Sequence, residues 1–151
     1  MGKTTEFKLS ILVVDDDENI LLVLRQSLEK EGYHVNTAKS AEEALNILQR
    51  SFFHVVITDI MMGAMSGVEL LMEIKKMNSL MQIFVMTSHS TLPRVIQCMQ
   101  GGAYDFFEKP LNIQDILVSL NEASRRAIRW RELYGRHSVS TEEKTDGSKL
   151  P

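Results

Sequence analysis

Five polar residues stand where short apolar runs of the sequence end, and their types fit a site that handles phosphate. They are Asp15, Asp16, Asp59, Thr87 and Lys109. Two carboxylates about 4 Å apart repel each other by roughly 4 kcal/mol at an effective dielectric near 20, so three of them stay ionised together only beside a cation. Hard oxygen ligands that leave room for water and a phosphate favour Mg²⁺ as that cation.

A carboxylate that lies beside Mg²⁺ and a lysine can attack phosphorus, because both cations neutralise charge on the equatorial oxygens. A threonine hydroxyl at the same place can donate a hydrogen bond to one phosphoryl oxygen. The five residues therefore predict phosphoryl transfer to an aspartate, provided that the fold brings them together.

The elements that would position these residues follow from the alternation of apolar runs with segments of helical periodicity. The runs cover residues 11–14, 33–37, 55–57, 83–86 and 105–107. Strands that alternate with helices form parallel βαβ units with right-handed crossovers. The pattern predicts an α/β fold: a single flavodoxin-like (βα)5 domain with a doubly wound, parallel, five-stranded sheet. Sites in such sheets form outside the carboxyl ends of the strands, where all five residues stand.

The helical segments carry their own start signals and apolar faces. Ser40 and Glu43 form a capping box, and Asp17 is expected to cap the first helix. We expect these side chains to be buried in the third and fourth helices: Val68, Leu71, Met72, Val95, Ile96 and Met99.

The composition excludes several classes of protein. The 151 residues amount to one domain, and a net charge of −3 excludes a bulk basic surface for nucleic acid. No apolar run reaches the ~18 residues that a membrane span needs. The first residues lack the apolar core of a secretory signal, and the lone Cys98 excludes an intrachain disulfide. We therefore expect a cytoplasmic protein.

The sequence divides into a domain at residues 7–126 and an extension at 127–151. Apolar residues recur at steps of four and three along the last helix, at Ile116, Leu120, Ala123, Ala127, Trp130 and Leu133 or Tyr134. This stripe predicts either a homodimer through the last helix or a monomer with Trp130 folded back onto its own domain. From residue 138 onward few apolar side chains remain, which favours a disordered linker or tail.

Four separated motifs connect the chain to a known family. They read VDDD at 14–17, DIMMGAMSG at 59–67, MTS at 86–88 and GAYDFFEKP at 102–110. With these motifs in order, residues 8–125 resemble the receiver domain of two-component response regulators. The last motif is similar to receivers of the NtrC type.

The resemblance implies a role for each matching residue. Asp59 would be the phosphoacceptor, and Lys109 would pair with the phosphoryl oxygens. Asp16 and Asp59 would bind Mg²⁺ by their side chains and Asp15 through water, with the Met61 backbone carbonyl completing the set. Thr87 and Phe106 would form the switch pair. The Lys109–Pro110 peptide would be cis.

The resemblance also implies partners rather than an enzyme activity. The phosphodonor would be a phosphohistidine on a sensor histidine kinase or a phosphotransfer protein, and the signal would pass to an output domain or partner that the sequence does not identify. Mg²⁺ would be the one cofactor. Gly63 departs from the family pattern, which usually has proline there, and this favours a more mobile loop.

Other functions use some of the same residue types. A Mg²⁺-dependent phosphatase with an aspartyl nucleophile would have a second carboxylate two residues after Asp59, where this chain has Met61. A flavin-binding flavodoxin would have a hydroxyl-rich phosphate loop where the chain has three aspartates. A receiver that works without phosphorylation would lack some of the five residues.

Overall fold

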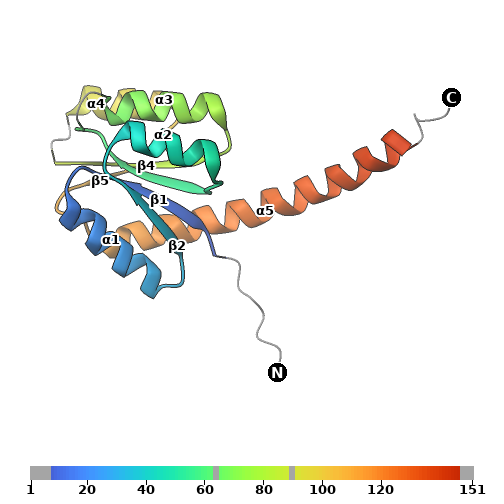
Figure 1. The fold of residues 1–151 in the computed structure, drawn as a ribbon, viewed down its shortest axis with the longest axis horizontal. Coiled ribbons are helices and arrows are strands. Elements are labelled where there is room, and N and C mark those ends of the chain that lie inside the picture. Colours follow the sequence, from blue (N-terminus) through green and yellow to red (C-terminus); the bar gives the residue numbers. More distant parts are fainter. Residues whose placement is uncertain (1–7, 63–64, 89–90, 147–151) are drawn as a thin grey trace.

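The computed structural model describes residues 8–62, 65–88 and 91–146, the last thirteen of them by their backbone only. Strands and helices alternate along the chain (Figure 1). The strands are β1 Ser10–Val14, β2 His34–Ala38, β3 Val55–Asp59, β4 Gln82–Thr87 and β5 Asp105–Glu108. The helices are α1 Glu18–Lys30, α2 Ala41–Arg50, α3 Gly67–Met77, α4 Leu92–Gln100 and α5 Ile113–Asp146.

The five strands form one parallel sheet in the order β2-β1-β3-β4-β5. This order confirms the predicted flavodoxin-like fold. Val14 of β1 lies opposite Thr58 of β3, so the next residues, Asp15 and Asp59, emerge side by side at the carboxyl edge. Thr87 ends β4 at the same edge, opposite Glu108 of β5.

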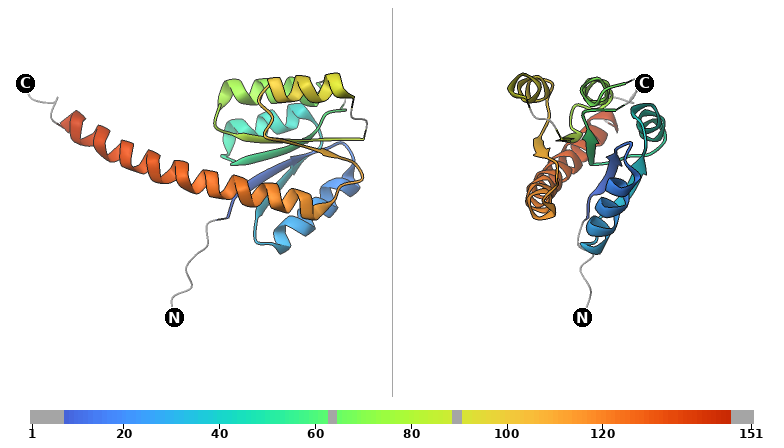
Figure 2. Two further views of the ribbon diagram at one scale, coloured as in Figure 1. Left: turned by 180° about the vertical axis from the view of Figure 1, so that it is seen from behind. Right: turned by 90° about the vertical axis from the view of Figure 1, so that its left-hand side faces the viewer.

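Helices cover both faces of the sheet, and alternate strand residues enter one layer or the other. Helices α2, α3 and α4 pack on one face, where Leu12, Val56 and Val85 point. Helices α1 and α5 pack on the other face, where Val13 and Ile57 point. Figure 2 shows the two helical layers with the sheet between them. Strands β1, β3 and β4 are buried on both faces, which explains why their predicted runs are continuously apolar, whereas the more polar β2 lies at an edge of the sheet.

The predicted helix starts are confirmed. Asp17 caps α1, because its side chain accepts a hydrogen bond from the Asn19 backbone N–H at 2.9 Å. Ser40 caps α2 by accepting from the Glu43 N–H at 3.1 Å, while the Glu43 carboxylate accepts from the Lys39 N–H. The caps place each helix start directly behind a strand end.

The expected buried faces of α3 and α4 are confirmed only in part, because Leu71 is buried as expected but other expected side chains lie one position away from the buried face. Met72 is 51% exposed, while Leu70, Leu71 and Ile74 are buried. In α4 the side chains of Ile96 and Met99 are 45% and 49% exposed, and Cys98 is the buried residue. One residue turns a helix by about 100°, so a face assigned one residue late points into solvent.

Helix α5 is longer than the composition indicates. It begins against the sheet, with Ile116, Leu120 and Ala123 fully buried, and continues to Asp146, well beyond the body of the domain (Figure 1). The expected loss of structure from residue 138 is therefore not seen over 138–146. No glycine or proline interrupts residues 136–146, which explains why a helix can continue there.

Over the described residues, no helix has the length and apolarity that crossing a membrane requires.

Candidate functional site

The structure brings three carboxylates together at the carboxyl edge of the sheet. Asp15 and Asp16 follow β1, Asp59 ends β3, and one oxygen from each lies within 4.8 Å of the others. Asp15 is fully buried and Asp59 is 5% exposed, whereas Asp16 faces solvent. The cluster therefore has two oxygen ligands fixed inside the protein and one at the opening.

Lys109 lies between the two buried carboxylates. Its Nζ donates to Asp15 Oδ2 at 2.8 Å and to Asp59 Oδ2 at 3.2 Å. Lys109 stands just after β5, so the ion pairs join both neighbouring strands β1 and β3 to the far side of the sheet. One ammonium cannot balance three carboxylates, and the site retains an excess of negative charge.

The two sides of this ion pair respond differently to their surroundings. Burial raises the pKa of Asp15 above its ordinary value, although the hydrogen bonds from Lys109 and from the Asp17 backbone act to lower it. Burial also acts to lower the pKa of Lys109, but its hydrogen bonds and charge interactions with Asp15 and Asp59 raise that pKa overall. Lys109 therefore favours its charged form, whereas the anion of Asp15 would be stabilised by further positive charge nearby.

Backbone hydrogen bonds fix the two carboxylates in place. The Asp17 N–H donates to Asp15 Oδ1 at 2.9 Å, and the Met61 N–H donates to Asp59 Oδ1 at 3.1 Å. The Lys109 N–H donates to the Thr87 carbonyl at 2.7 Å, which ties the lysine to the end of β4. The site is held by the strand ends themselves, so little reorganisation is needed to use it.

Gly67 matters to the site in a way that sequence reasoning missed. A Cβ atom at residue 67 would lie 2.1 Å from the Asp59 carbonyl oxygen and 2.7 Å from the Ile60 Cα. The Gly67 N–H donates to the Ile60 carbonyl at 2.8 Å, so the start of α3 packs directly on the chain after Asp59. A glycine placed immediately after the Ser66 cap was the available signal.

The expected switch residues lie at the same edge. Thr87 is fully buried at the end of β4, and Phe106 of β5 is partly buried against the core beneath α2, α3 and α4. Phe106 pairs in register with Val85. The Lys109–Pro110 peptide is cis, as the resemblance implied. Gly63, the departure from the family pattern, lies outside the described residues.

The donor set fits the metal that the resemblance implies. Three carboxylates supply hard oxygen ligands within reach of one ion, and the exposed Asp16 leaves an opening for water and a phosphate. Such sites favour Mg²⁺, which keeps several waters and binds through few carboxylates. The excess negative charge and the raised pKa of Asp15 also favour a bound cation at these carboxylates.

Comparisons with known proteins agree with this geometry. Residues 11–121 match the response regulator receiver domain family. The transcriptional regulatory protein GlrR of Escherichia coli (strain K12) is 34% identical over 127 residues, which cover 81% of this chain and 29% of GlrR. The C4-dicarboxylate transport transcriptional regulatory protein DctD of Rhizobium meliloti is 33% identical over 117 residues, which cover 78% of this chain and 25% of DctD. The chain thus spans under a third of these relatives.

Solved structures give the same result for the fold. A response regulator receiver domain protein from Clostridium thermocellum superposes with a TM-score of 0.77 at 36% identity, covering 81% of this chain and 98% of that one. The BeF3-activated DrrB receiver domain superposes with a TM-score of 0.72 at 31% identity, covering 78% and 97%. The likeness to NtrC-type receivers is also confirmed, because GlrR and DctD are regulators of that type. The chain therefore belongs to the family of response regulator receiver domains.

Proposed function

We propose that Asp59 accepts a phosphoryl group from a phosphohistidine of a sensor histidine kinase or phosphotransfer protein. The observation that carries this proposal is the Lys109 ammonium held between Asp15 and Asp59, with the Asp16 carboxylate beside them. Asp15 and Asp59 are each bound by Lys109 and by a backbone N–H, but Asp15 is fully buried whereas Asp59 keeps 5% of its surface exposed. A phosphoryl group at this carboxylate would thus meet cationic and N–H donors already in place.

In the proposed reaction an Asp59 carboxylate oxygen forms a bond to phosphorus while the bond from phosphorus to the donor's imidazole nitrogen breaks. The electron pair of that bond stays on the imidazole nitrogen, which takes up a proton. Lys109 pairs with the equatorial phosphoryl oxygens, because its ammonium already points into the cluster.

Mg²⁺ would be held by the side chains of Asp16 and Asp59, by Asp15 through water, and by the Met61 backbone carbonyl. When bound, the ion supplies positive charge to the oxygens of the transferring group. Lys109 and the backbone N–H groups of Asp17 and Met61 keep the carboxylates oriented toward one point.

We propose that Thr87 and Phe106 transmit the effect of Asp59 phosphorylation to the surface beside β5. The Thr87 hydroxyl would move to donate to a phosphoryl oxygen, and the Phe106 ring would turn inward into the space beside it. The partial burial of Phe106, next to a fully buried Thr87 on the neighbouring strand, supports this coupling.

The chain is a phosphoacceptor regulatory domain of a two-component system and not a catalytic enzyme, so the phosphatase alternative falls. GlrR and DctD are named transcriptional regulatory proteins, and we propose transcription as the process that this receiver controls. Its free thiol at Cys98 is compatible with the cytoplasmic location proposed for it.

A groove beside the site supports a protein as the phosphodonor. It lies between α1 and the chain after β5, has a volume of about 320 Å³, and includes Ile20, Val23, Lys109 and Pro110 in its lining. Val23 is 52% exposed. An apolar surface that reaches Lys109 would let a docked donor present its phosphohistidine to Asp59.

We also propose a homodimer through α5. The apolar side chains of Ile128 and Leu133 are 39% and 46% exposed on the part of the helix that leaves the domain. Sedimentation of the wild type and of the Leu133→Gln variant, with and without beryllofluoride, tests the dimer. A wild type that stays monomeric at high concentration in both states would remove it.

The test of the phosphoacceptor is the mass of the intact protein after incubation with acetyl phosphate. We expect the wild type to gain one phosphoryl group only when Mg²⁺ is present, and the Asp59→Asn variant to gain none. Asp17→Asn is the matched control, because it removes a carboxylate from the same edge while asparagine still caps α1. Equal uptake by Asp59→Asn and wild type would remove Asp59 from this role.

A further inference from the structure

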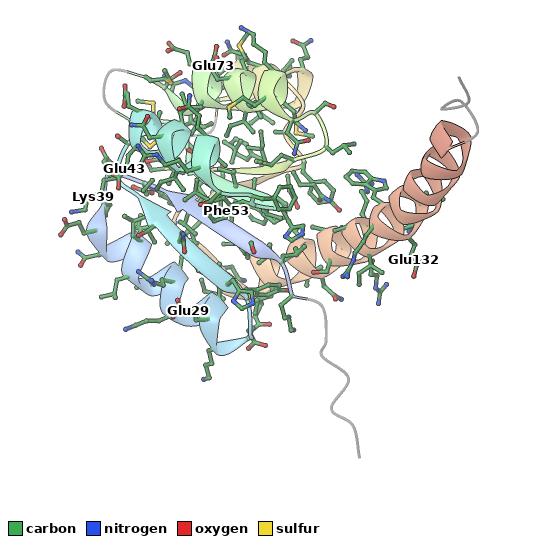
Figure 3. The ribbon with its side chains drawn as sticks, turned by 45° about the vertical axis from the view of Figure 1, so that its right-hand side comes forward. Glu29, Lys39, Glu43, Phe53, Glu73 and Glu132 are labelled. Atoms are coloured by element: carbon green, nitrogen blue, oxygen red, sulfur yellow. The ribbon has the colours of Figure 1, made fainter. Side chains whose placement is uncertain are left out.

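A second hollow lies at the end of the sheet opposite the carboxylates. Gln82, the first residue of β4, and His54, directly before β3, belong to its lining, whereas Thr87 and Asp59 end those two strands at the other edge. One turn of α5, which carries Ala127, Trp130 and Arg131, forms another part of its wall. Figure 3 shows Phe53, another lining residue, at this end of the sheet near α5.

The size and the walls of this hollow suit one flat ring. Its volume is about 330 Å³, within the range of small-ligand pockets. Phe52 and Leu80, both in the lining, are 66% and 46% exposed. The Phe52 ring meets the His54 ring edge-on, with 4.9 Å between centroids. A ring bound between Phe52, Leu80 and Trp130 would cover apolar surface that now faces water.

The charge of the lining favours an anion. Arg131 is a cation, and no aspartate or glutamate belongs to the lining. His54 accepts a hydrogen bond from the Ser10 N–H at Nδ1, at 3.0 Å. Burial, and then the charge of Arg131, lowers the pKa of His54, which keeps that ring neutral at neutral pH. A carboxylate on the ligand therefore meets one positive group at the rim and no negative one.

One residue of the lining, Gln82, carries a buried hydrogen-bond acceptor without a partner in the described part of the chain. Gln82 is 5% exposed, and its Oε1 has no hydrogen-bond partner among the residues that the structure describes. Its Nε2 donates to the Ala123 carbonyl at 3.5 Å, the long end of the hydrogen-bond range. A buried acceptor without a partner is costly, and a ligand O–H that meets the Gln82 amide as it turns toward the hollow removes that cost.

We propose that this hollow binds a small aromatic carboxylic acid with a ring hydroxyl. The ring packs between Phe52, Leu80 and Trp130, the carboxylate pairs with Arg131, and the hydroxyl donates to Gln82. The site joins the β3 and β4 ends of the sheet to α5 just before that helix leaves the domain. A bound acid therefore fastens the start of the α5 extension to the domain, independently of the chemistry at Asp59.

The probe is 4-hydroxybenzoate, and the readout is the indole N–H cross-peak of Trp130 in proton–nitrogen NMR. Trp130 is the one tryptophan of the chain, so the signal is unambiguous. We expect saturable shifts with a Kd of about 1 mM or tighter, as for a ligand of this size. Benzoate and phenol, which lack the hydroxyl and the carboxylate in turn, should each bind about fivefold more weakly.

Variants assign each contact separately. Arg131→Gln should weaken the binding of 4-hydroxybenzoate and benzoate about fivefold and leave the binding of phenol unchanged. Gln82→Leu should weaken the binding of 4-hydroxybenzoate and phenol and leave the binding of benzoate unchanged. Ala127→Leu, which fills the hollow, should abolish binding of all three probes. Arg129→Gln is the matched control, because it removes a cation from α5 outside this lining.

Three results would overturn the proposal. One is the absence of saturable shifts at the Trp130 indole with any probe. Another is equal binding by wild type and Ala127→Leu. The third is a probe-induced indole shift that disappears when the protein is diluted until it is monomeric, because a second copy of the chain would then form part of the site. Unchanged unfolding midpoints of the variants show that the comparison is made on folded protein.

Discussion

The two ends of the sheet use the same strands for opposite purposes. At the carboxyl end, the nearly buried Asp15 after β1 and Asp59 at the end of β3 are joined at 2.8 and 3.2 Å by Lys109, which follows β5. At the other end, β3 and β4 begin beside a mostly apolar hollow, and the Oε1 of its lining residue Gln82 lacks a hydrogen-bond partner among the described residues. The difference indicates that one end is built to hold charges in a fixed geometry, whereas the other offers a mostly apolar surface on which a ring can pack.

The largest effect at the carboxyl end should come from Gly67→Ala. The added Cβ would lie 2.1 Å from the Asp59 carbonyl oxygen, and backbone on both sides must move to admit it. We expect a loss of about 3 kcal/mol in the free energy of unfolding, as for overpacking in a core. Displacement of Asp59 should also weaken Mg²⁺ binding and phosphoryl uptake. Urea unfolding and Mg²⁺ titration measure both.

Gly101→Ala is the control for this prediction. Its Cβ would lie 2.9 Å from the end of the Leu71 side chain, which can rotate away, and it is far along the chain from the carboxylates. We expect a loss of about 1 kcal/mol and normal Mg²⁺ binding. Equal Mg²⁺ affinity in wild type and Gly67→Ala would show that the close approach of α3 does not position Asp59.

Removing the central cation should have the next largest effect. Lys109→Met leaves Asp15 and Asp59 buried without their positive partner, and we expect a loss of about 2 kcal/mol without Mg²⁺. Saturating Mg²⁺ should stabilise the variant more than the wild type, because the metal alone then balances the carboxylates. Lys76→Met, which removes an exposed pair with Glu73, should cost less than about 0.5 kcal/mol. Equal Mg²⁺ stabilisation of wild type and Lys109→Met would contradict this account.

The carboxyl end could be predicted from the sequence because each member is a distinct residue type at the end of one strand. Asp15, Asp59 and Lys109 need only a parallel topology to meet, and the alternation of runs predicts that topology. The cis peptide at Lys109 followed from the resemblance.

The opposite end could not be predicted in this way. Its hollow combines residues near 52–54, 78–82 and 127–131, and no periodicity relates three such segments. The apolar stripe of the last helix left two places open for Trp130, a dimer interface or its own domain, and Trp130 is partly buried in this lining. The buried face of a helix can also be misjudged by one position, as with Ile96 and Met99. Contacts that depend on packing leave no mark at single sequence positions.

A smaller effect should follow Thr87→Ala. The variant loses a buried hydroxyl at the carboxyl end, which costs about 1 kcal/mol. We expect it still to gain a phosphoryl group, since Asp59 and Lys109 are intact. The amide shifts of Phe106 on addition of beryllofluoride should shrink, and Thr87→Ser should restore them. Full Phe106 shifts in Thr87→Ala would break the proposed link between the two residues.

The smallest effect concerns pH and the opposite end. The folded protein holds the pKa of His54 below its ordinary 6.5, through burial first and then the charge of Arg131. The unfolded chain therefore takes up a proton before the folded one does, and stability falls as pH drops below about 6.5. His54→Asn keeps an acceptor for the Ser10 N–H but does not titrate. Between pH 7.5 and 5 we expect its free energy of unfolding to fall by about 0.5 kcal/mol less than that of the wild type. Arg131→Gln should show an intermediate loss, because the second cause of the shift is gone. Parallel curves of stability against pH for wild type and His54→Asn would mean that His54 is as open to water as an ordinary surface residue. The two ends of the sheet would then differ in residue type but not in burial.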